Sequence, residues 1–465
     1  MIPAAVGGTI AHADDERRAG FLDALMSRIA GCFRRCEPRQ LVREFVLGLL
    51  MELEDHNCWT LGEALGHSGP HRLQHLLSRA KWDEQQVLDE TAVWAAGHLT
   101  SGDTHNGADQ DAGWDAGRDA VFIVDETGDA KSSTDCVGAA RQYSGSLGGV
   151  ALCQVTVNLT YATARGHTII DRRLYLPRDW AADEERRELA GVPEQVEFAT
   201  KPQLAAQMLT HAHTRQITAP FAAGDEVYGG RELRACIRGL GMGYVMAVKH
   251  DHTVTLGPHT TTARKAVRLI GDGGWQRMRT GTGTKGIRSY DWAMLAITPD
   301  DDPTDPATDP AGQAILLVRR HRYTRKLSYY RCWSPHPVPL ARLVAVATLR
   351  WKIEEDHQLA KQAAGLDKGQ TTRWRSWHRW SCLALLAHTY LAVTAAAERA
   401  TGSPSDPDLI AITVPELLRL IRGTIVPPPR NDLAHRHAWS LWRRRHQHRA
   451  RQCHQAWHAY AETTP

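Results

Sequence analysis

Two short apolar segments of this chain each end at an aspartate, and the two aspartates are 100 residues apart. The first segment is VFIVDE, in which Asp125 follows four β-forming residues, and the second is APFAAGDEVYGG, which contains Asp225. The apolar pattern from residue 119 to 251 predicts elements in the order β-β-β-α-β-α-β. We therefore expect a mixed sheet with helices on its faces, in which a right-handed crossover places the fourth strand parallel to the first.

In this arrangement the carboxyl ends of the two strands lie at one edge of the sheet, and the two aspartates meet there. Adjacent carboxylates repel each other unless a cation intervenes, and a cluster of oxygen ligands suits Mg²⁺. Two such ions about 3.5–4 Å apart can promote hydrolysis of a phosphodiester. The alternative is that each aspartate is an ordinary turn residue. Neighbouring strand residues point to opposite faces, so Asp125 and Glu126 cannot both face one site, nor can Asp225 and Glu226.

A third carboxylate is predicted on a long helix that follows the strand-rich region. In the stretch LRWKIEEDHQLAK, a rotation of about 100° per residue places Arg350, Glu354 and Lys361 within a stripe about 40° wide. Glu355 and Asp356 lie about 100° and about 200° further round the helix than Glu354. We favour Glu354 as the acid that faces the site, because two cations that can hold phosphates share its face. The alternative is a solvated ion pair between Arg350 and Glu354.

The composition is that of a soluble globular protein, and its charge is unevenly spread. The chain has 465 residues, of which 42% are hydrophobic and 23% charged, which suggests two to four domains. The net charge is +4, but residues 341–465 contain 18 Lys/Arg and 10 Asp/Glu, a net of +8. This basic quarter suggests a polyanionic partner. Its end mixes Arg443, Arg444 and Arg445 with Trp and His, which suits a helix that faces nucleic acid; a solvated terminal helix is the alternative.

The nine cysteines are scattered and odd in number, which favours a reducing cytoplasm over a disulfide framework. Cys32, Cys36, His56 and Cys58 lack the paired spacing of a zinc site, so we do not expect zinc there. The start of the chain shows no basic region followed by an apolar core, so no signal peptide is expected. The longest apolar run begins at Cys382 and is shorter than the ~20 residues of a bilayer span, which predicts a buried helix.

The pattern along the chain predicts six regions: a helical region at 1–100, a polar linker at 101–118, the first part of the mixed-sheet domain at 119–251, a β-rich region at 252–338, the rest of the mixed-sheet domain at 339–400, and a basic helical region at 401–465. In the first region Thr60 and Glu63 form a capping-box pattern, and HSGPHRLQHLLSRA adds a tight turn and a second helix. Two short helices across a turn form either a helix-turn-helix that enters a DNA groove or part of a plain helical bundle, and both interpretations stay open.

Three stretches of the sequence, VDETGDAKSS, GDEVYGG and LRWKIEEDHQLAKQAAGLD, occur in this order and resemble the DDE transposases of bacterial insertion sequences. The resemblance is to the insertion-sequence-four superfamily, in particular its seven-oh-one-like branch, and covers about residues 61–391. It implies a ribonuclease-H-like catalytic domain interrupted by a β-rich insertion, with a helical N-terminal DNA-binding domain and a helical basic C-terminus. Arg350, Glu354 and Lys361 match the spacing of the family's tyrosine–arginine–glutamate–lysine signature, whereas Ala347 stands at the tyrosine position.

The resemblance assigns catalysis and metal binding to Asp125, Asp225 and Glu354, with two Mg²⁺ ions per site and Mn²⁺ as a substitute. It implies a transposase that binds double-stranded DNA at terminal inverted repeats, hydrolyses the phosphodiester at each end and joins the freed 3′-OH to target DNA. It also implies a homodimer or larger assembly, located with the bacterial nucleoid in the cytoplasm. Trp275 and Trp292 are candidates for stacking on a displaced base, and a buried core position is the alternative for each.

Two other functions fit the same residues. A domesticated, cleavage-silent descendant would bind DNA as a regulator, and a general nuclease of the same fold would cleave without preference for an end. In all three functions we expect DNA contacts from Arg350, Lys361 and the Arg443–Arg445 cluster. The histidines near the C-terminus, such as His446 and His448, are expected to contact phosphate or to be exposed rather than to bind a metal.

Overall fold

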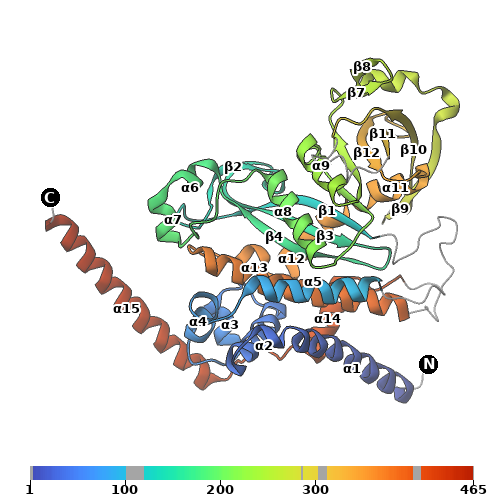
Figure 1. Ribbon diagram of the computed structural model, residues 1–465. Helices are drawn as coiled ribbons and strands as arrows, with labels where there is room; N and C mark the ends of the chain where they lie inside the picture. The colour runs from blue at the N-terminus through green and yellow to red at the C-terminus, as the bar shows by residue number, and fades with distance from the viewer. Residues whose placement is uncertain (1–3, 101–119, 284–285, 302–311, 402–409, 464–465) are drawn as a thin grey trace.

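The computed structural model describes most of the chain, in five segments: residues 4–100, 120–283, 286–301, 312–401 and 410–463. The protein has a mixed α/β fold built on a ten-stranded sheet, with helices packed against it (Figure 1). This confirms the predicted fold class at the level of a large mixed sheet with many helices. The predicted linker at residues 101–118 lies outside the described residues.

The N-terminal segment is helical, as its apolar spacing predicted. Its helices are α1 (Ala4–Arg28), α2 (Cys36–Leu50), α3 (Cys58–Ala64), α4 (His71–Ser78) and α5 (Glu84–Thr100). The predicted capping box is wrong in its position, because the residue that caps α3 is Asn57. Its Oδ1 accepts hydrogen bonds from the backbone N–H groups of Trp59 at 2.8 Å and Thr60 at 3.1 Å. Asparagine is favoured there because its short side chain satisfies N–H groups that the first turn leaves unpaired.

The strands of the large sheet are β1 (Val121–Ala130), β2 (Ala140–Ser144), β3 (Gly149–Ala162), β4 (His167–Tyr175), β5 (Phe221–Gly224), β6 (Gly243–Val248), β9 (Gln276–Gly283), β10 (Gly286–Ile297), β11 (Gln313–Arg320) and β12 (Leu327–Ser334). Their order is β2-β3-β1-β5-β6-β12-β11-β10-β9, and β4 pairs with β3. The predicted parallel pairing of the first strand with the strand before Asp225 is confirmed, because β1 lies parallel to β5. The predicted count of three strands before the first helix is wrong, because the short edge strand β2 makes four.

The remaining helices are α6 (Arg178–Ala182), α7 (Glu184–Ala190), α8 (Lys201–Thr214), α9 (Arg231–Gly239), α10 (Ala263–Ala266), α11 (Leu340–Leu349), α12 (Lys352–Ala364), α13 (Trp374–Thr401), α14 (Val414–Thr424) and α15 (Leu433–Thr463). Different helices cover the two faces of β1. Phe122 and Val124 belong to the core that contains α8 and α9. Val121 and Ile123 belong to a second core that contains α11 and the start of α12. The period of two along the strand therefore decides which helices each side chain meets.

The predicted β-rich region at residues 252–338 extends the same sheet rather than forming an unconnected one. Strand β12 pairs with β6, and β11, β10 and β9 follow it in antiparallel order. Only the hairpin of β7 (Thr253–Leu256) and β8 (His259–Thr262) forms a separate small sheet among the described strands. The region at residues 252–338 is rich in strands, as predicted, and its role as a separate insertion domain stays a prediction.

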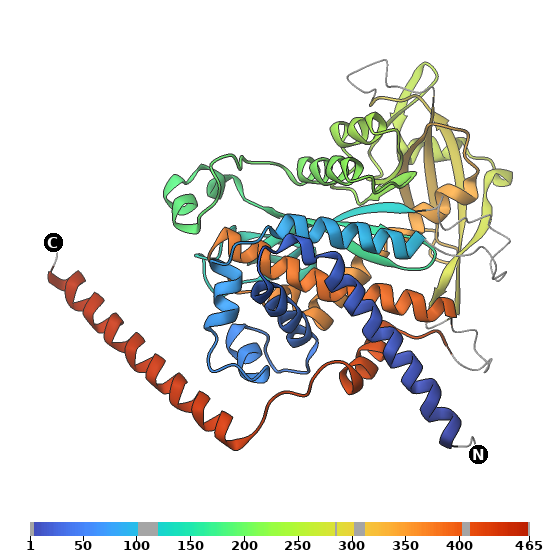
Figure 2. The ribbon, with the colours of Figure 1, turned by 60° about the horizontal axis from the view of Figure 1, so that its bottom comes forward.

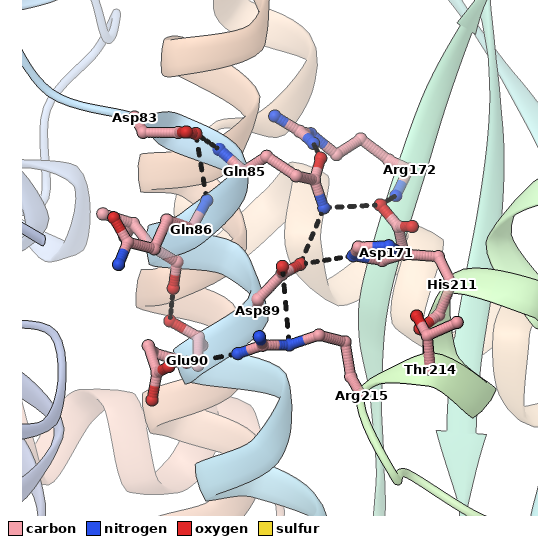
Figure 3. Close-up of polar contacts among 12 residues, drawn as sticks. Asp83, Gln85, Gln86, Asp89, Glu90, Asp171, Arg172, His211, Thr214 and Arg215 are labelled. Atoms are coloured by element: carbon pink, nitrogen blue, oxygen red, sulfur yellow. Dashed lines mark hydrogen bonds and ion pairs between the residues drawn. The ribbon is translucent and has the colours of Figure 1, made fainter.

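Helix α5 joins the N-terminal helices to the sheet through a network of polar side chains (Figure 3). Asp89 of α5 contacts His211 Nε2 of α8 at 2.8 Å and Arg215 Nε at 3.6 Å. The side-chain oxygen of Gln85 accepts a hydrogen bond from Arg172 Nη1 of β4 at 3.1 Å. Apolar residues of α1–α5 also lie in the core that contains β1 and β3. The N-terminal helices and the sheet are thus packed against each other directly.

The sequence predicted one long helix that contains Glu354, and this prediction is wrong, because the structure has two helices in that stretch. Helix α11 ends at Leu349 and α12 begins at Lys352, so Arg350 lies in the turn between them. In this turn the backbone N–H of Trp351 bonds to the Thr348 carbonyl at 3.4 Å, three residues back instead of the four of a regular α-helix.

Helix α13 contains the apolar run that the sequence predicted to be buried. Among the described residues it is the one helix long and apolar enough to cross a membrane, and 94% of its apolar window is buried inside the protein. Its polar positions are also buried, and His388 and Thr389 have relative exposures of 0% and 1%. This burial is that of a core helix, as predicted.

Helix α15 extends away from the rest of the protein, as two views of the ribbon show (Figures 1 and 2). Its first turns are anchored: Trp439 is buried, and its Nε1 donates a hydrogen bond to the His67 carbonyl at 2.7 Å. Trp442 packs against Trp59 of α3 with ring centroids 4.8 Å apart. Side chains from Arg451 to Tyr460 are exposed. The predicted C-terminal helix is confirmed, and it is held at one end.

The cap of α3 can be tested with two substitutions. Asn57→Ala removes the acceptor for two backbone N–H groups, so we expect the free energy of unfolding to fall by about 1 kcal/mol. Asn57→Asp keeps an acceptor in place and should stay close to the wild type. Urea unfolding followed by circular dichroism measures both, and equal stability of the two variants would contradict the assignment of Asn57 as the cap.

Candidate active site

Asp125 lies within β1, not at its end, so the prediction that the strand stops there is wrong. The strand continues to Ala130 because its antiparallel pairing with β3 continues beyond the acid. What stops at this point is the parallel pairing with β5, whose last pair is Val124 with Gly224. Asp225 follows Gly224 directly. Asp125 and Asp225 are therefore the next residues in register on two adjacent parallel strands.

Glu126 points to the opposite face of the sheet from Asp125, as strand alternation predicted. Its Oε1 accepts a hydrogen bond from Lys201 Nζ of α8 at 2.7 Å. Its Oε2 accepts one from the hydroxyl of Tyr228 at 2.6 Å. Glu126 thus ties β1 to α8 and to the turn after β5, which gives a structural role to an acid for which the sequence indicated none.

Arg350 connects Asp125 with Glu354. Its Nη1 lies 3.4 Å from Asp125 Oδ2, and its Nη2 donates a hydrogen bond to Glu354 Oε1 at 2.7 Å. The ion pair between Arg350 and Glu354 that the helical spacing allowed is therefore present. It is not isolated at the surface, because the same guanidinium reaches the acid on β1. The side chains of Asp125 and Glu354 are 15% and 34% exposed, so both groups are reachable from solvent.

The electrostatics of the site favour binding of a cation. Burial raises the pKa of Asp125 to about 7, and the neighbouring charge of Asp225 contributes to this rise while Arg350 opposes it. Burial also raises the pKa of Asp225, to which Glu126 contributes. Burial alone would lower the pKa of Arg350, but its hydrogen bond to Glu354 and the charge of Asp125 raise it. One guanidinium thus faces three carboxylates, Asp125, Asp225 and Glu354.

The donor set fits a hard divalent cation. All three acids offer oxygen ligands, which Mg²⁺ and Mn²⁺ prefer, and a cation beside Asp125 would oppose the rise of its pKa that burial and Asp225 cause. The acids do not form a ready-made cluster, since no group of three His, Cys, Asp or Glu within the described residues is placed to hold a metal ion. Arg350 contacts both Asp125 and Glu354, so Glu354 can join the two aspartates only if the guanidinium moves.

A groove of about 1030 Å³ opens beside these acids. It is lined by Arg350, by Tyr143 of β2, by the turn from Asp225 to Val227, by the C-terminal end of β6 with the residues after it, and by the start of β12 with Lys326. Lys249, His250 and Lys326 are exposed side chains along this groove. A groove with basic side chains next to a cluster of acids suits an extended polyanion.

Comparison with known proteins identifies the family of this chain. The model of the DDE superfamily endonuclease family matches residues 28–282 of the chain. The chain belongs to this family. It is also similar to the probable transposase for insertion sequence element IS701 of Microchaete diplosiphon, with 28% identity over 215 residues. That similarity covers 46% of this chain and 49% of the relative, so the chain spans about half the length of that protein.

Lys361 was expected to contact DNA, but its side chain is bonded to β1. Its Nζ donates hydrogen bonds to Thr127 Oγ1 at 2.7 Å and to the Gly128 carbonyl at 2.9 Å, and it lies 2.7 Å from Asp129 Oδ1. These contacts fasten α12 to β1, which corrects the prediction that Lys361 is available to phosphate. Ala347, at the tyrosine position of the family signature, is buried in the core under β1 and β5.

The two candidate tryptophans differ. Trp292 has a relative exposure of 1% and packs against Tyr330 with ring centroids 5.9 Å apart. The prediction that it stacks on a base is wrong, because alternation along β10 turns its ring into the core. Trp275 is half-buried, and the guanidinium of Arg320 lies 4.0 Å from its ring centroid. Its role as a stacking residue stays a prediction.

The predicted DNA-binding surfaces at the two ends of the chain lie together. Helices α3 and α4 form the expected helix pair, and α15 packs on them. Arg443 pairs with Glu63 of α3, whereas Arg444 and Arg445 are exposed. The helix pair is thus covered in part by the basic helix, and Arg444 and Arg445 are the members of the arginine cluster that face solvent.

Sequence reasoning missed several side chains that shape this DDE endonuclease site. Tyr228 lies three residues after Asp225 in the GDEVYGG stretch, so its position was visible but its contact with Glu126 was not. Lys249 directly follows β6 and Lys326 directly precedes β12, and the pairing of these two strands brings both lysines to one groove.

The burial of Trp292 gives a clear expectation. Trp292→Ala should lower the free energy of unfolding by about 3–5 kcal/mol, because it empties a core position. Trp292→Phe keeps an aromatic ring in the core, so we expect it to be less destabilised and to bind DNA with wild-type affinity in fluorescence anisotropy. A large loss of DNA affinity in the stably folded Phe variant would contradict the buried role.

Proposed function

We propose that this DDE endonuclease is a transposase that cleaves the ends of an insertion sequence and joins them to target DNA. The observation that carries the proposal is the register of β1 and β5, which places Asp125 beside Asp225, with Glu354 reached through Arg350. The similarity to a probable insertion-sequence transposase supports the same function. The order β4-β3-β1-β5-β6, antiparallel on one side of β1 and parallel on the other, is consistent with the ribonuclease-H-like domain that the resemblance implies.

In this proposal Asp125, Asp225 and Glu354 hold two Mg²⁺ ions, or Mn²⁺ in their place, which supply an activated water and stabilise the leaving oxygen of the phosphodiester. The protein's own groups prepare that site. Arg350 balances the acids before DNA binds, and a DNA phosphate offers its guanidinium a second anionic partner. When Arg350 turns to the phosphate, Glu354 is released to face the two aspartates.

The rest of the proposed reaction depends on holding DNA in the groove. Lys249, His250 and Lys326 would contact the backbone of a strand that enters beside Asp225, while Arg444 and Arg445 on α15 and the pair of helices α3 and α4 would contact the duplex further away. Hydrolysis at the element end frees a 3′-OH, and the same site would then direct that hydroxyl to target DNA. Pairing of the two ends would require two copies of the chain.

Substitution of each acid tests the catalytic assignment. Asp125→Asn, Asp225→Asn and Glu354→Gln should each abolish Mg²⁺-dependent cleavage of labelled element-end DNA, because each removes a negative ligand. DNA binding should persist in all three, since the acids make no attractive contact with phosphate. The matched control is Glu232→Gln on α9, an exposed glutamate that does not line the groove, which should cleave like the wild type.

The cleavage assay also separates the other functions that fit the sequence. Full cleavage by any one of the three acid variants would remove that residue from the catalytic set. Specific DNA binding by the wild-type protein with no cleavage in Mg²⁺ or Mn²⁺ would indicate a cleavage-silent regulator. Cleavage without preference for the element end would indicate a general nuclease.

The groove makes its own prediction about DNA affinity. Lys249→Ala and Lys326→Ala should each weaken binding of element-end DNA and lower the slope of log K against log salt concentration by about 1, because each lysine neutralises one phosphate. Lys265→Ala on α10, an exposed lysine outside the groove, is the matched control. Anisotropy titrations at several salt concentrations measure the slope, and an unchanged slope in both groove variants would exclude the groove as the DNA path.

A further inference from the structure

Helix α12 has two faces with opposite environments. Glu354 has a 34% exposed side chain on the face toward Arg350 and the sheet acids. Asp356 lies about 200° round the helix from Glu354 and has a relative exposure of 0%. An aspartate is rarely buried in this way unless every oxygen has a partner. The buried acid therefore needs an explanation that the catalytic acids do not supply.

Asp356 is held by three elements at once. Its Oδ2 accepts a hydrogen bond from Thr160 Oγ1 of β3 at 2.8 Å. Its Oδ1 contacts His167 Nδ1 of β4 at 2.8 Å and His388 Nε2 of α13 at 3.1 Å. Thr160 and His388 are also fully buried. Both carboxylate oxygens are thus tied to parts of the protein that cannot shift without disturbing the core.

The residues on either side of Asp356 are tied to the same strands. Glu355 Oε2 lies 3.2 Å from His167 Nε2, so one imidazole bridges two successive acids of α12. His357 Nε2 lies 3.1 Å from Asn158 Nδ2 of β3. Burial alone would lower the pKa of His167, but the charge and hydrogen bond of Asp356 raise it to about 9, which keeps the bridge an ion pair at neutral pH.

This arrangement controls the rotation of α12 about its own axis. The helix with its side chains has a radius of about 5–6 Å, so a rotation of about 10° moves a side-chain tip on its far face by about 1 Å. A displacement of about 1 Å at a reacting centre can lower a rate by about 100-fold. Apolar contacts hold a helix against a sheet but permit small rotations, whereas directional hydrogen bonds from three sides fix one angle.

On the basis of the proposed function, we propose that Asp356 is a positioning residue, which through Thr160, His167 and His388 fixes the rotation of α12 and so places Glu354 for cleavage. Asp356 does not itself touch DNA or the cleavage site in this proposal. It acts through the helix that it shares with Glu354. The contacts on β3 and β4 also link that helix to β3, which pairs with β1, and to β4, which pairs with β3, so the third acid and the first are set by one framework.

The test uses a matched pair at Thr160, where the buried hydroxyl can be removed with little change in shape. Thr160→Val deletes the donor to Asp356 Oδ2, and Thr160→Ser restores it. We expect Thr160→Val and Asp356→Ala to lower the single-turnover rate of end cleavage by about 10-fold or more, with the Kd for DNA unchanged. Thr160→Ser should recover most of the rate. Binding of Mn²⁺ to the full-length protein, followed by electron paramagnetic resonance, should be weaker in Thr160→Val and Asp356→Ala.

A second control separates positioning from general stability. Leu22→Ala empties a buried position in α1, far along the chain from α12, and should lower the thermal midpoint while cleavage at a permissive temperature stays at the wild-type rate. Wild-type cleavage rates and Mn²⁺ binding in folded Thr160→Val and Asp356→Ala would overturn the proposal and leave the cluster a stabilising feature alone. If the proposed function fails, the wild-type protein does not cleave the DNA. In that case the Mn²⁺ binding of the two Thr160 variants still decides whether Asp356 positions the helix.

Discussion

The parallel pairing of β1 with β5 is the constraint on which the rest of the site depends. It places Asp125 and Asp225 side by side, half-hidden from water, where burial and then the charge of Asp225 raise the pKa of Asp125. A protein keeps such a pair only if a positive charge is provided. In this structure Arg350 provides it, from a turn between two helices rather than from the sheet. The position of that turn therefore matters as much as the position of the strands.

The break between α11 and α12 places Arg350 in a short turn between two well-packed helices. Helix α11 belongs to the apolar core below β1 and β5, and α12 is tied to β1, β3, β4 and α13 by polar contacts. Arg350 lies between these two supports and contacts one acid from each side. A change of partner by this one side chain would alter the charge balance of the site without movement of either helix.

Period and chirality account for the features that the sequence predicted correctly. The parallel crossover, the opposite directions of Asp125 and Glu126 and the contact of Arg350 with Glu354 all derive from local geometry, although Arg350 lies in a turn and not on the helix of Glu354. The features that the sequence could not predict depend on contacts between distant segments. The extension of β1 beyond Asp125 requires its pairing with β3, and the contact of Lys361 with β1 requires the final placement of α12. The same is true of the burial of Asp356, for which the sequence indicated only that it lies on another face of the helix from Glu354.

Three successive positions on α12 thus obey different physical requirements. Glu354 is partly exposed and pairs with Arg350, Glu355 pairs with His167 and Lys352, and Asp356 is buried with both of its oxygens bonded. These requirements are compatible only because about 100° of rotation separates each residue from the next. A shift of the helix by one residue would bury the exposed acid and expose the buried one. The order of the three acidic residues therefore matters more than their summed charge, because it decides which of them is buried.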